Sequence, residues 1–261
     1  MATAEILTIG SELIDGLRTD TNATWLAKEL TNLGIRVAQI TSVGDIVEDV
    51  AATIRDALAR FPDVLIITGG LGPTIDDRTS EGLALATRRN LVLNPDALEL
   101  VKMSYARVHA RGLVLRKWLT SARKKMAFIP NGATALPNPV GTAPGIQIVQ
   151  GKTLIICLPG VPTEMRAIFT RYVRDDLVKL NRQAKHRVSI DVRGIDESTL
   201  APLFNRLSEK FRRLDVRSYP SVKGIRGRVK VILVSPTAAE AKEAETTFNA
   251  WLKKLRTSAP H

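Results

Sequence analysis

The stretch Thr68-Gly69-Gly70-Leu71-Gly72-Pro73-Thr74 decides the fold expected for this chain. It follows the apolar run 64–67, which is typical of a strand buried on both faces. A helical segment follows, which we expect over residues 76–88. A strand, a glycine turn and a helix in this order favour phosphate binding, because glycines let the backbone approach an anion and the N–H groups at a helix start point toward it.

Two carboxylates, Asp76 and Asp77, follow the glycine turn directly. Beside a phosphate they would repel it, unless a divalent cation with hard oxygen ligands lies between them. The alternative is that either carboxylate only caps the following helix. We favour the metal site, because three glycines and two carboxylates exceed what a turn requires.

The first half of the sequence alternates strand and helix patterns. Strands are expected at 4–9, 35–43 and 63–68, and helices at 22–33, 47–61 and 76–88. This alternation predicts an α/β fold with a doubly wound, mainly parallel sheet. Ligands of such sheets bind beyond the carboxyl ends of the strands. Ser11, Glu12 and Asp45 follow two of those strands and are therefore expected near the glycine turn.

The pattern changes at about residue 183. Before it we expect a helix over 94–110, a hairpin of 146–149 with 153–158, and a helix over 163–180. After it a strand, a helix, a second strand and a final helix are predicted, which form a small α+β module. The hydrophilic segment 181–186 is the natural boundary. We therefore expect two domains, 1–182 and 183–261.

Three further positions each have a functional and a structural interpretation. Asp45 either holds a cation or orients a water, or it caps the helix near Val47. Asp20 precedes a helix, where capping and a site role are equally reasonable. Lys125 either adds positive charge near a substrate or is an ordinary surface lysine.

The proline- and glycine-rich segment 138–145 is too constrained for an ordinary connector. Such a loop presents N–H groups and a hydroxyl to a ligand, so Asn138, Gly141 and Thr142 are expected to bind substrate. Glu164 either faces the site or favours the positive end of its helix dipole, and the dipole explanation is preferred.

Charge and composition limit the class of protein. The 261 residues carry a net charge of +12, and no Asp or Glu occurs from 100 to 163. Such basic stretches either attract anions or form solvated faces. The single cysteine, Cys157, lies in an apolar run and is expected to be a buried thiol in a reducing compartment. No apolar run approaches the roughly 20 residues of a membrane span, and no signal peptide is visible, so a cytoplasmic protein without a membrane partner is expected.

Several motifs together resemble the CinA family, which is related to the molybdopterin-binding domains of molybdenum cofactor biosynthesis. They are Gly10-Ser11-Glu12-Leu13 with Gly16, Asp20-Thr21-Asn22, and the segments 68–79, 138–145 and 158–165. The resemblance spans roughly residues 4–180. It implies a MogA/MoaB-like core, a metal-dependent pyrophosphatase activity on ADP-ribose or a similar nucleotide diphosphate compound, and a dimer or trimer. It also places Asp45 and Asp77 where pterin-adenylating relatives carry acidic catalytic residues.

Two departures from that pattern affect the expectation. Leu71 stands where pterin-binding relatives commonly carry threonine, which favours the CinA branch. The chain ends without the amidohydrolase domain of longer CinA proteins, so a standalone form without nicotinamide-nucleotide deamidation is expected.

The resulting hypothesis is an enzyme that hydrolyses a phosphoanhydride with a divalent ion such as Mg, Mn or Co. Asp45 and Asp77 are the predicted catalytic residues, and Asp45, Asp76, Asp77 and Asp20 the predicted metal ligands. The predicted substrate-binding residues are Ser11, Glu12, Thr68, Gly69, Gly70, Gly72, Thr74, Asn138, Gly141, Thr142 and Lys125. Two alternatives remain open. One is binding or adenylation of molybdopterin, and the other is a non-catalytic nucleic-acid-binding module, which the aromatic share of 5% disfavours.

Overall fold

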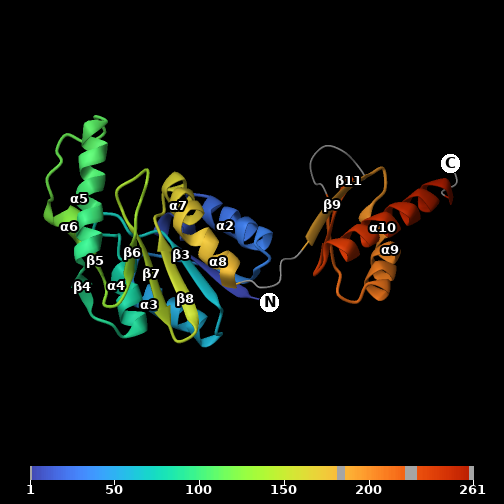
Figure 1. Cartoon of the computed structure of the whole chain (residues 1–261), viewed down its shortest axis with the longest axis horizontal. Helices are drawn as coiled ribbons and strands as arrows, with labels where there is room; N and C mark the ends of the chain where they lie inside the picture. Colours follow the sequence, from blue (N-terminus) through green and yellow to red (C-terminus); the bar gives the residue numbers. More distant parts are fainter. Residues whose placement is uncertain (1, 181–185, 221–227, 259–261) are drawn as a thin grey trace. The chain divides into compact units, whose positions relative to one another are not determined.

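The computed structural model describes residues 2–180, 186–220 and 228–258. The chain divides into two compact units, Met1–Arg182 and Gln183–His261 (Figure 1). Within the described ranges, no helix is long and apolar enough to cross a bilayer.

A six-stranded sheet forms the centre of the first unit. Its strand order is β2-β1-β3-β8-β7-β6. The neighbours among β2, β1, β3 and β8 are parallel, while β7 pairs antiparallel with both β8 and β6. The doubly wound, mainly parallel sheet is thus confirmed. The strands are β1 Thr3–Ile9, β2 Arg36–Val43, β3 Val64–Thr68, β6 Thr134–Leu136, β7 Gly145–Gln150 and β8 Thr153–Leu158.

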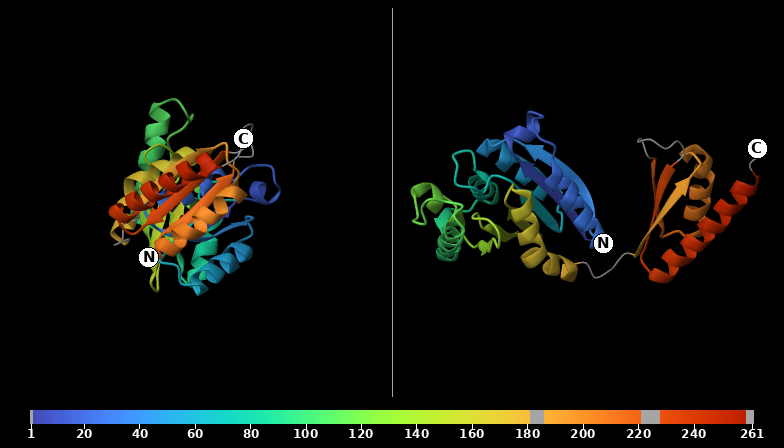
Figure 2. Two further views of the ribbon diagram at one scale, coloured as in Figure 1. Left: turned by 90° about the vertical axis from the view of Figure 1, so that its right-hand side faces the viewer. Right: turned by 90° about the horizontal axis from the view of Figure 1, so that it is seen from above.

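Helices cover both faces of this sheet (Figures 1 and 2). On one face α2 (Thr21–Asn32), α7 (Pro162–Ile168), the π-helical turn Phe169–Val173 and α8 (Arg174–Leu180) bury Leu26, Leu30 and Phe169. On the other face α3 (Val47–Ala59), α4 (Thr79–Thr87) and α5 (Pro95–Ala110) bury Val50, Leu83 and Val101. The sheet therefore has a core on each face, and every residue of the central strand β3 is buried.

Short elements complete the first unit. They are α1 (Ser11–Ile14), α6 (Ser121–Lys125) and a two-stranded sheet of β4 (Leu91–Leu93) with β5 (Phe128–Pro130). These elements could not be predicted from the sequence because they are too short to show a period. The predicted helix 76–88 begins later than expected, at Thr79, since the N–H of Thr79 donates to the carbonyl of Gly70 and closes the preceding segment into a loop.

Cys157 is fully buried in β8, as expected, and burial raises the pKa of its thiol. The thiol is therefore protonated and unreactive in the folded protein.

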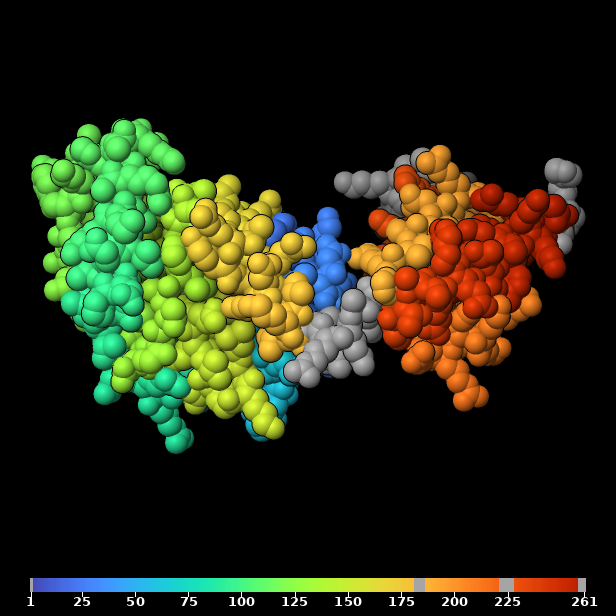
Figure 3. Space-filling model, viewed as in Figure 1, coloured from blue at the N-terminus to red at the C-terminus, as the bar shows by residue number. Residues whose placement is uncertain are grey.

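The second unit is a three-stranded antiparallel sheet with two helices. The strand order is β10-β11-β9, from β9 (His186–Arg193), β10 (Asp215–Pro220) and β11 (Arg228–Ser235). The helices α9 (Glu197–Lys210) and α10 (Ala238–Ser258) bury Leu200, Leu207 and Phe248 against one face of the sheet. In the space-filling view α10 (red) lies across the near side of this unit (Figure 3). The strand β10 was not predicted from the sequence, because its residues are mostly polar.

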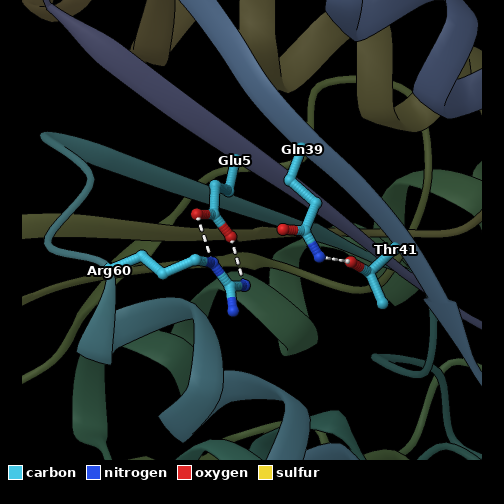
Figure 4. Close-up of polar contacts among 4 residues, drawn as sticks. All are labelled: Glu5, Gln39, Thr41 and Arg60. Carbon is cyan, nitrogen blue, oxygen red and sulfur yellow. Dashed lines mark hydrogen bonds and ion pairs between the residues drawn. The ribbon is translucent and has the colours of Figure 1, made fainter.

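A buried carboxylate on an inner strand connects the first sheet to α3. Glu5 of β1 is 3% exposed, and Arg60 at the end of α3 donates from Nε and Nη2 to its two oxygens at 2.8 and 2.6 Å (Figure 4). On the neighbouring strand the Gln39 amide donates to the Thr41 hydroxyl at 3.1 Å. The bidentate geometry satisfies both oxygens of the buried carboxylate.

Replacing Arg60 by alanine is expected to lower the free energy of unfolding by roughly 2 kcal/mol, because it leaves the Glu5 carboxylate buried without a partner. Urea unfolding of the purified variant measures this. Arg55→Ala, an exposed arginine of the same helix, is the matched control and is expected to change stability by less than about 0.5 kcal/mol. Equal effects of the two substitutions would show that the ion pair of Arg60 with Glu5 does not stabilise the fold.

Candidate functional site

A cavity of about 530 Å³ lies beyond the carboxyl ends of β1, β2, β3 and β8. Four segments that follow these strands line it, and its walls combine glycines, carboxylates and a few apolar side chains. The lining residues are Ile9, Gly10, Glu12, Arg18, Asp45, Gly69–Pro73, Asp76, Asp77, Thr142, Ala143, Pro159–Pro162 and Glu164. This is the position at which ligands bind in open α/β sheets.

The glycines of the turn after β3 are required by its close packing. Gly69 (φ +110°) has its Cβ position occupied by the carbonyl oxygen of Ile9, and Gly70 (φ +61°) by the hydroxyl of Thr79. That hydroxyl donates to the Gly69 carbonyl at 2.7 Å. The turn is therefore held by β1 and by the start of α4, with its backbone forming the cavity wall.

Thr74 connects the two carboxylates that follow the turn. Its backbone N–H donates to Asp77 Oδ2 at 2.9 Å, and its hydroxyl contacts both Asp76 and Asp77. The pKa of Asp76 is lowered, chiefly by the Thr74 hydroxyl and also by the backbone and by Lys125. Lys125 Nζ in turn donates to the Thr74 carbonyl at 2.5 Å. Neither carboxylate caps α4, whose N-cap is Arg78 without a side-chain hydrogen bond.

Asp45 is held against the start of α1. The N–H and the hydroxyl of Ser11 both donate to Asp45 Oδ2 at 2.8 Å. The capping interpretation of Asp45 is wrong, because the N-cap of α3 is Ile46 and receives no side-chain hydrogen bond. Ser11 thus positions Asp45, while Asp45 itself lines the cavity.

Asp20 lies in an adjoining, smaller cavity of about 90 Å³ that Thr68 and Glu12 also line. Asp20 Oδ1 accepts from the N–H of Ala23 at 2.8 Å, so the structural interpretation of Asp20 as the N-cap of α2 is confirmed. Its other oxygen, Oδ2, is buried and has no hydrogen-bond partner among the described residues.

The rigid segment 138–145 closes the opposite wall. The Asn138 side chain accepts from the N–H of Gly141 at 2.7 Å and donates to Glu164 Oε2 at 2.5 Å. Arg107 of α5 donates to the carbonyls of Asn138 and Gly141 at 2.8 and 2.7 Å. Asn138 and Gly141 therefore shape the wall from behind, and Thr142 and Glu164 reach the cavity.

Burial raises the pKa of Glu164, and hydrogen bonds from Asn138 and the backbone of Thr142 oppose the rise. A raised folded-state pKa means that stability is full below the ordinary glutamate value of about 4.3 and is lost as the pH rises through the folded pKa.

Glu164→Gln is therefore expected to remove this part of the pH dependence, because the amide does not titrate. Urea unfolding of both proteins between pH 4 and 7.5 measures it. The wild type is expected to lose stability relative to the variant as the pH rises. A difference between them that stays constant with pH would contradict the shift.

The structure brings together eight of the predicted residues at the main cavity: Glu12, Asp45, Gly69, Gly70, Gly72, Asp76, Asp77 and Thr142. Others support them from outside this lining: Ser11, Thr74, Asn138 and Gly141 by the contacts above, and Lys125 from a neighbouring small cavity. Arg18 was missed, since a lone arginine in a loop carries no sequence signal. Arg107 was also missed, because it contacts Asn138, 31 residues further along the chain, and no local pattern reveals such a contact.

Carboxylates dominate the electrostatics of the cavity. Five line it (Glu12, Asp45, Asp76, Asp77 and Glu164), and Arg18 is the one basic side chain among the lining residues. Within the part of the chain that the structure describes, no three acidic, histidine or cysteine side chains form a ready metal site. The protein thus offers single carboxylates and pairs, and an ion held there would need further oxygen ligands from water or phosphate. Mg²⁺ is commonly bound in this way, by one or two carboxylates and substrate phosphates.

Comparison with family models matches residues 5–179 to a probable molybdopterin binding domain. Residues 5–179 include every residue that lines the cavity, with the glycine turn after β3 and residues of the segment 138–145 among them.

Two related proteins resemble the chain over nearly its full length. A protein of Pyrobaculum calidifontis is 42% identical over 258 residues, covering 98% of this chain and 95% of its own. A protein of Aeropyrum pernix is 41% identical over 254 residues, covering 97% and 92%. Among solved structures, the protein CinA with unknown function from Thermoplasma acidophilum is 36% identical with a TM-score of 0.60, covering 67% of this chain and 98% of that one.

Proposed function

Since the chain belongs to the family of probable molybdopterin binding domains, we propose that the 530 Å³ cavity binds a phosphorylated, pterin-type molecule of molybdenum cofactor biosynthesis. This takes the pterin alternative ahead of nucleotide hydrolysis as the main hypothesis. The observation that supports it most is the chemical contrast between the two walls of the cavity.

The wall formed by 69–77 suits the phosphate end of such a ligand. It presents backbone glycines and the paired carboxylates Asp76 and Asp77. Carboxylates beside a phosphate require a cation between them, because the like charges otherwise repel. Asp45 and Asp77 are the residues that we propose to hold it, with Asp76 in support.

The wall formed by 142–143 and 159–164 suits the ring. Ala143, Val161 and Pro162 offer apolar surface, and Glu164 offers carboxyl oxygens. The aminopyrimidinone edge of a pterin carries N–H donors that pair with such acceptors. Glycine backbone, apolar surface and a carboxyl group together fit a flat heterocycle that carries phosphate.

Equilibrium titration of the full chain with a pterin diphosphate, with ADP-ribose and with inorganic pyrophosphate tests this proposal. In the presence of Mg²⁺ the pterin diphosphate is expected to bind at least tenfold more tightly than pyrophosphate, because only the pterin compound fills the ring wall. Equal affinities of the two would contradict a pterin site.

A second function is favoured by one specific observation. Asp45 and Asp77 line the same cavity from different strand ends, β2 and the turn after β3. Two such carboxylates can hold an ion that neutralises phosphate charge while one of them orients a water. We therefore keep metal-dependent hydrolysis of a nucleotide diphosphate compound, such as ADP-ribose, as the second candidate.

Release of AMP from ADP-ribose, screened against Mg²⁺, Mn²⁺ and Co²⁺, tests that activity. Turnover that disappears with a chelator is the result expected of a hydrolase. Pterin binding without AMP release would leave the first function and reject the second.

A further inference from the structure

Within the described residues of the second unit, the helices cover only one face of the sheet. Both helices, α9 and α10, lie on the same side of β9 and β11 (Figures 1 and 2). Val192, Val229, Val231 and Leu233 point to that side and form the core with the helices. Because side chains alternate along a strand, the intervening residues of the three strands share the other face.

The register of the strands places the members of this outer face. Arg193 pairs with Arg228, Asp191 with Lys230, and Lys230 with Tyr219 on the far strand. We call the following set the outer face: Arg187, Ser189, Asp191 and Arg193 of β9, Arg228, Lys230, Ile232 and Val234 of β11, and Asp215, Arg217 and Tyr219 of β10.

The outer face is basic, with five cations and two acids. The two acids are already engaged, Asp215 by Arg217 at 2.7 Å and Asp191 by Arg228 at 3.3 Å. Among the described residues, Arg187, Arg193 and Lys230 have no acidic partner, and all three are exposed. Arg193 and Arg228 stand directly opposite each other, an arrangement of like charges that costs stability in an antiparallel pair. Asp191 offsets this cost at Arg228, which leaves Arg193 available for an external anion.

Tyr219 adds an aromatic ring beside these charges. It is 50% exposed and lies directly across from Lys230, although its strand was not expected from sequence. An open antiparallel sheet with an exposed ring and neighbouring cations is a surface on which single-stranded nucleic acids bind, with a base stacked on the ring and phosphates on the cations.

We propose that the outer face of the second unit binds single-stranded nucleic acid. Tyr219 stacks one base, and Arg193 and Lys230 contact the adjacent phosphates. An anionic membrane offers no flat ring to stack on Tyr219, and Ile232 and Val234 on this face are buried and so offer no apolar surface for insertion. With one aromatic residue, the binding is weak, tolerant of sequence and strongly dependent on salt.

Fluorescence anisotropy of the full chain with a labelled 12-nucleotide single strand tests the proposal at 50 and 200 mM NaCl. The expected result is micromolar binding at 50 mM that weakens at least tenfold at 200 mM. The double variant Arg193→Glu with Lys230→Glu is expected to lose at least tenfold in affinity and to reduce the salt slope. Tyr219→Ala is expected to lose several-fold with the salt slope unchanged, because it removes stacking and no charge.

The matched control reverses two charges away from this face. Arg212→Glu with Lys253→Glu changes the net charge of the chain by the same amount, and both residues are exposed outside the three strands. It is expected to lose less than threefold. Thermal unfolding of each variant confirms that it is folded.

Three results would overturn the proposal. One is an equal loss in the control and face variants, which would show general charge attraction. Another is tighter binding of a duplex of the same length, and the third is binding of anionic vesicles, but of no oligonucleotide, that the face variants abolish. These variants lie outside the first unit and are expected to leave pterin binding unchanged, so the outcome is independent of the proposed function.

Discussion

Gly69→Ala is expected to disrupt the cavity and to destabilise the first unit. An alanine Cβ at this position would overlap the backbone carbonyl of Ile9, which belongs to β1 and cannot move aside. The φ of +110° adds strain for any residue with a side chain. The expected loss of unfolding free energy is roughly 4 kcal/mol, together with loss of ligand binding.

Gly151→Ala is the matched control for Gly69→Ala. Gly151 also has a positive φ, +60°, but no atom lies within 4 Å of its Cβ position. Gly151→Ala is therefore expected to lower the free energy of unfolding by only about 1 kcal/mol, the cost of a side chain at a positive φ. Denaturant unfolding of both variants separates the cost of overlap with Ile9 from the cost of the positive φ. Similar losses of unfolding free energy would contradict the expected overlap at Gly69.

Asp77→Asn is expected to abolish the contribution of Mg²⁺ to ligand affinity. Asparagine keeps an acceptor for the N–H of Thr74, which Asp77 binds at 2.9 Å, so the turn is expected to fold while the cation loses a charged ligand. The loss is about 100-fold in the Mg²⁺-dependent affinity or turnover, the scale of removing one electrostatic contributor of ~3 kcal/mol.

The comparison for Asp77→Asn is Asp15→Asn, an exposed carboxylate of the loop after α1 that is absent from the cavity lining. It has the same change of charge and is expected to leave affinity within about twofold, because surface charges are screened. A folded Asp77→Asn protein with undiminished Mg²⁺-dependent binding would reject its role.

The elements with a regular apolar pattern could be predicted from the sequence. The alternating apolar segments predicted β1, β2, β3 and the helices between them, since buried strands and amphipathic helices have clear periods. The glycine turn and the polar residues at the strand ends predicted the place of the cavity, because parallel strands bring their carboxyl ends together.

Contacts between distant segments were beyond sequence reasoning. Asp45 appeared able to cap α3, but the structure pairs it with Ser11, 34 residues away. Glu164 lies in the first turn of α7, as the dipole explanation requires, but its contact with Asn138 and its place in the cavity wall could not be predicted. Tyr219 and Arg217 lie in β10, whose polar residues gave no strand signal, so the outer face emerges only from the strand register.

The most direct test of the central claim is calorimetric titration of the full chain with a pterin diphosphate, with and without Mg²⁺. Because the described cavity offers no group of three carboxylates, Mg²⁺ alone is expected to bind weakly. The pterin diphosphate is expected to bind at least tenfold more tightly with Mg²⁺ present than with a chelator present. Equally tight binding in the chelator, or no binding under either condition, would contradict a cavity in which carboxylates and phosphate share a cation.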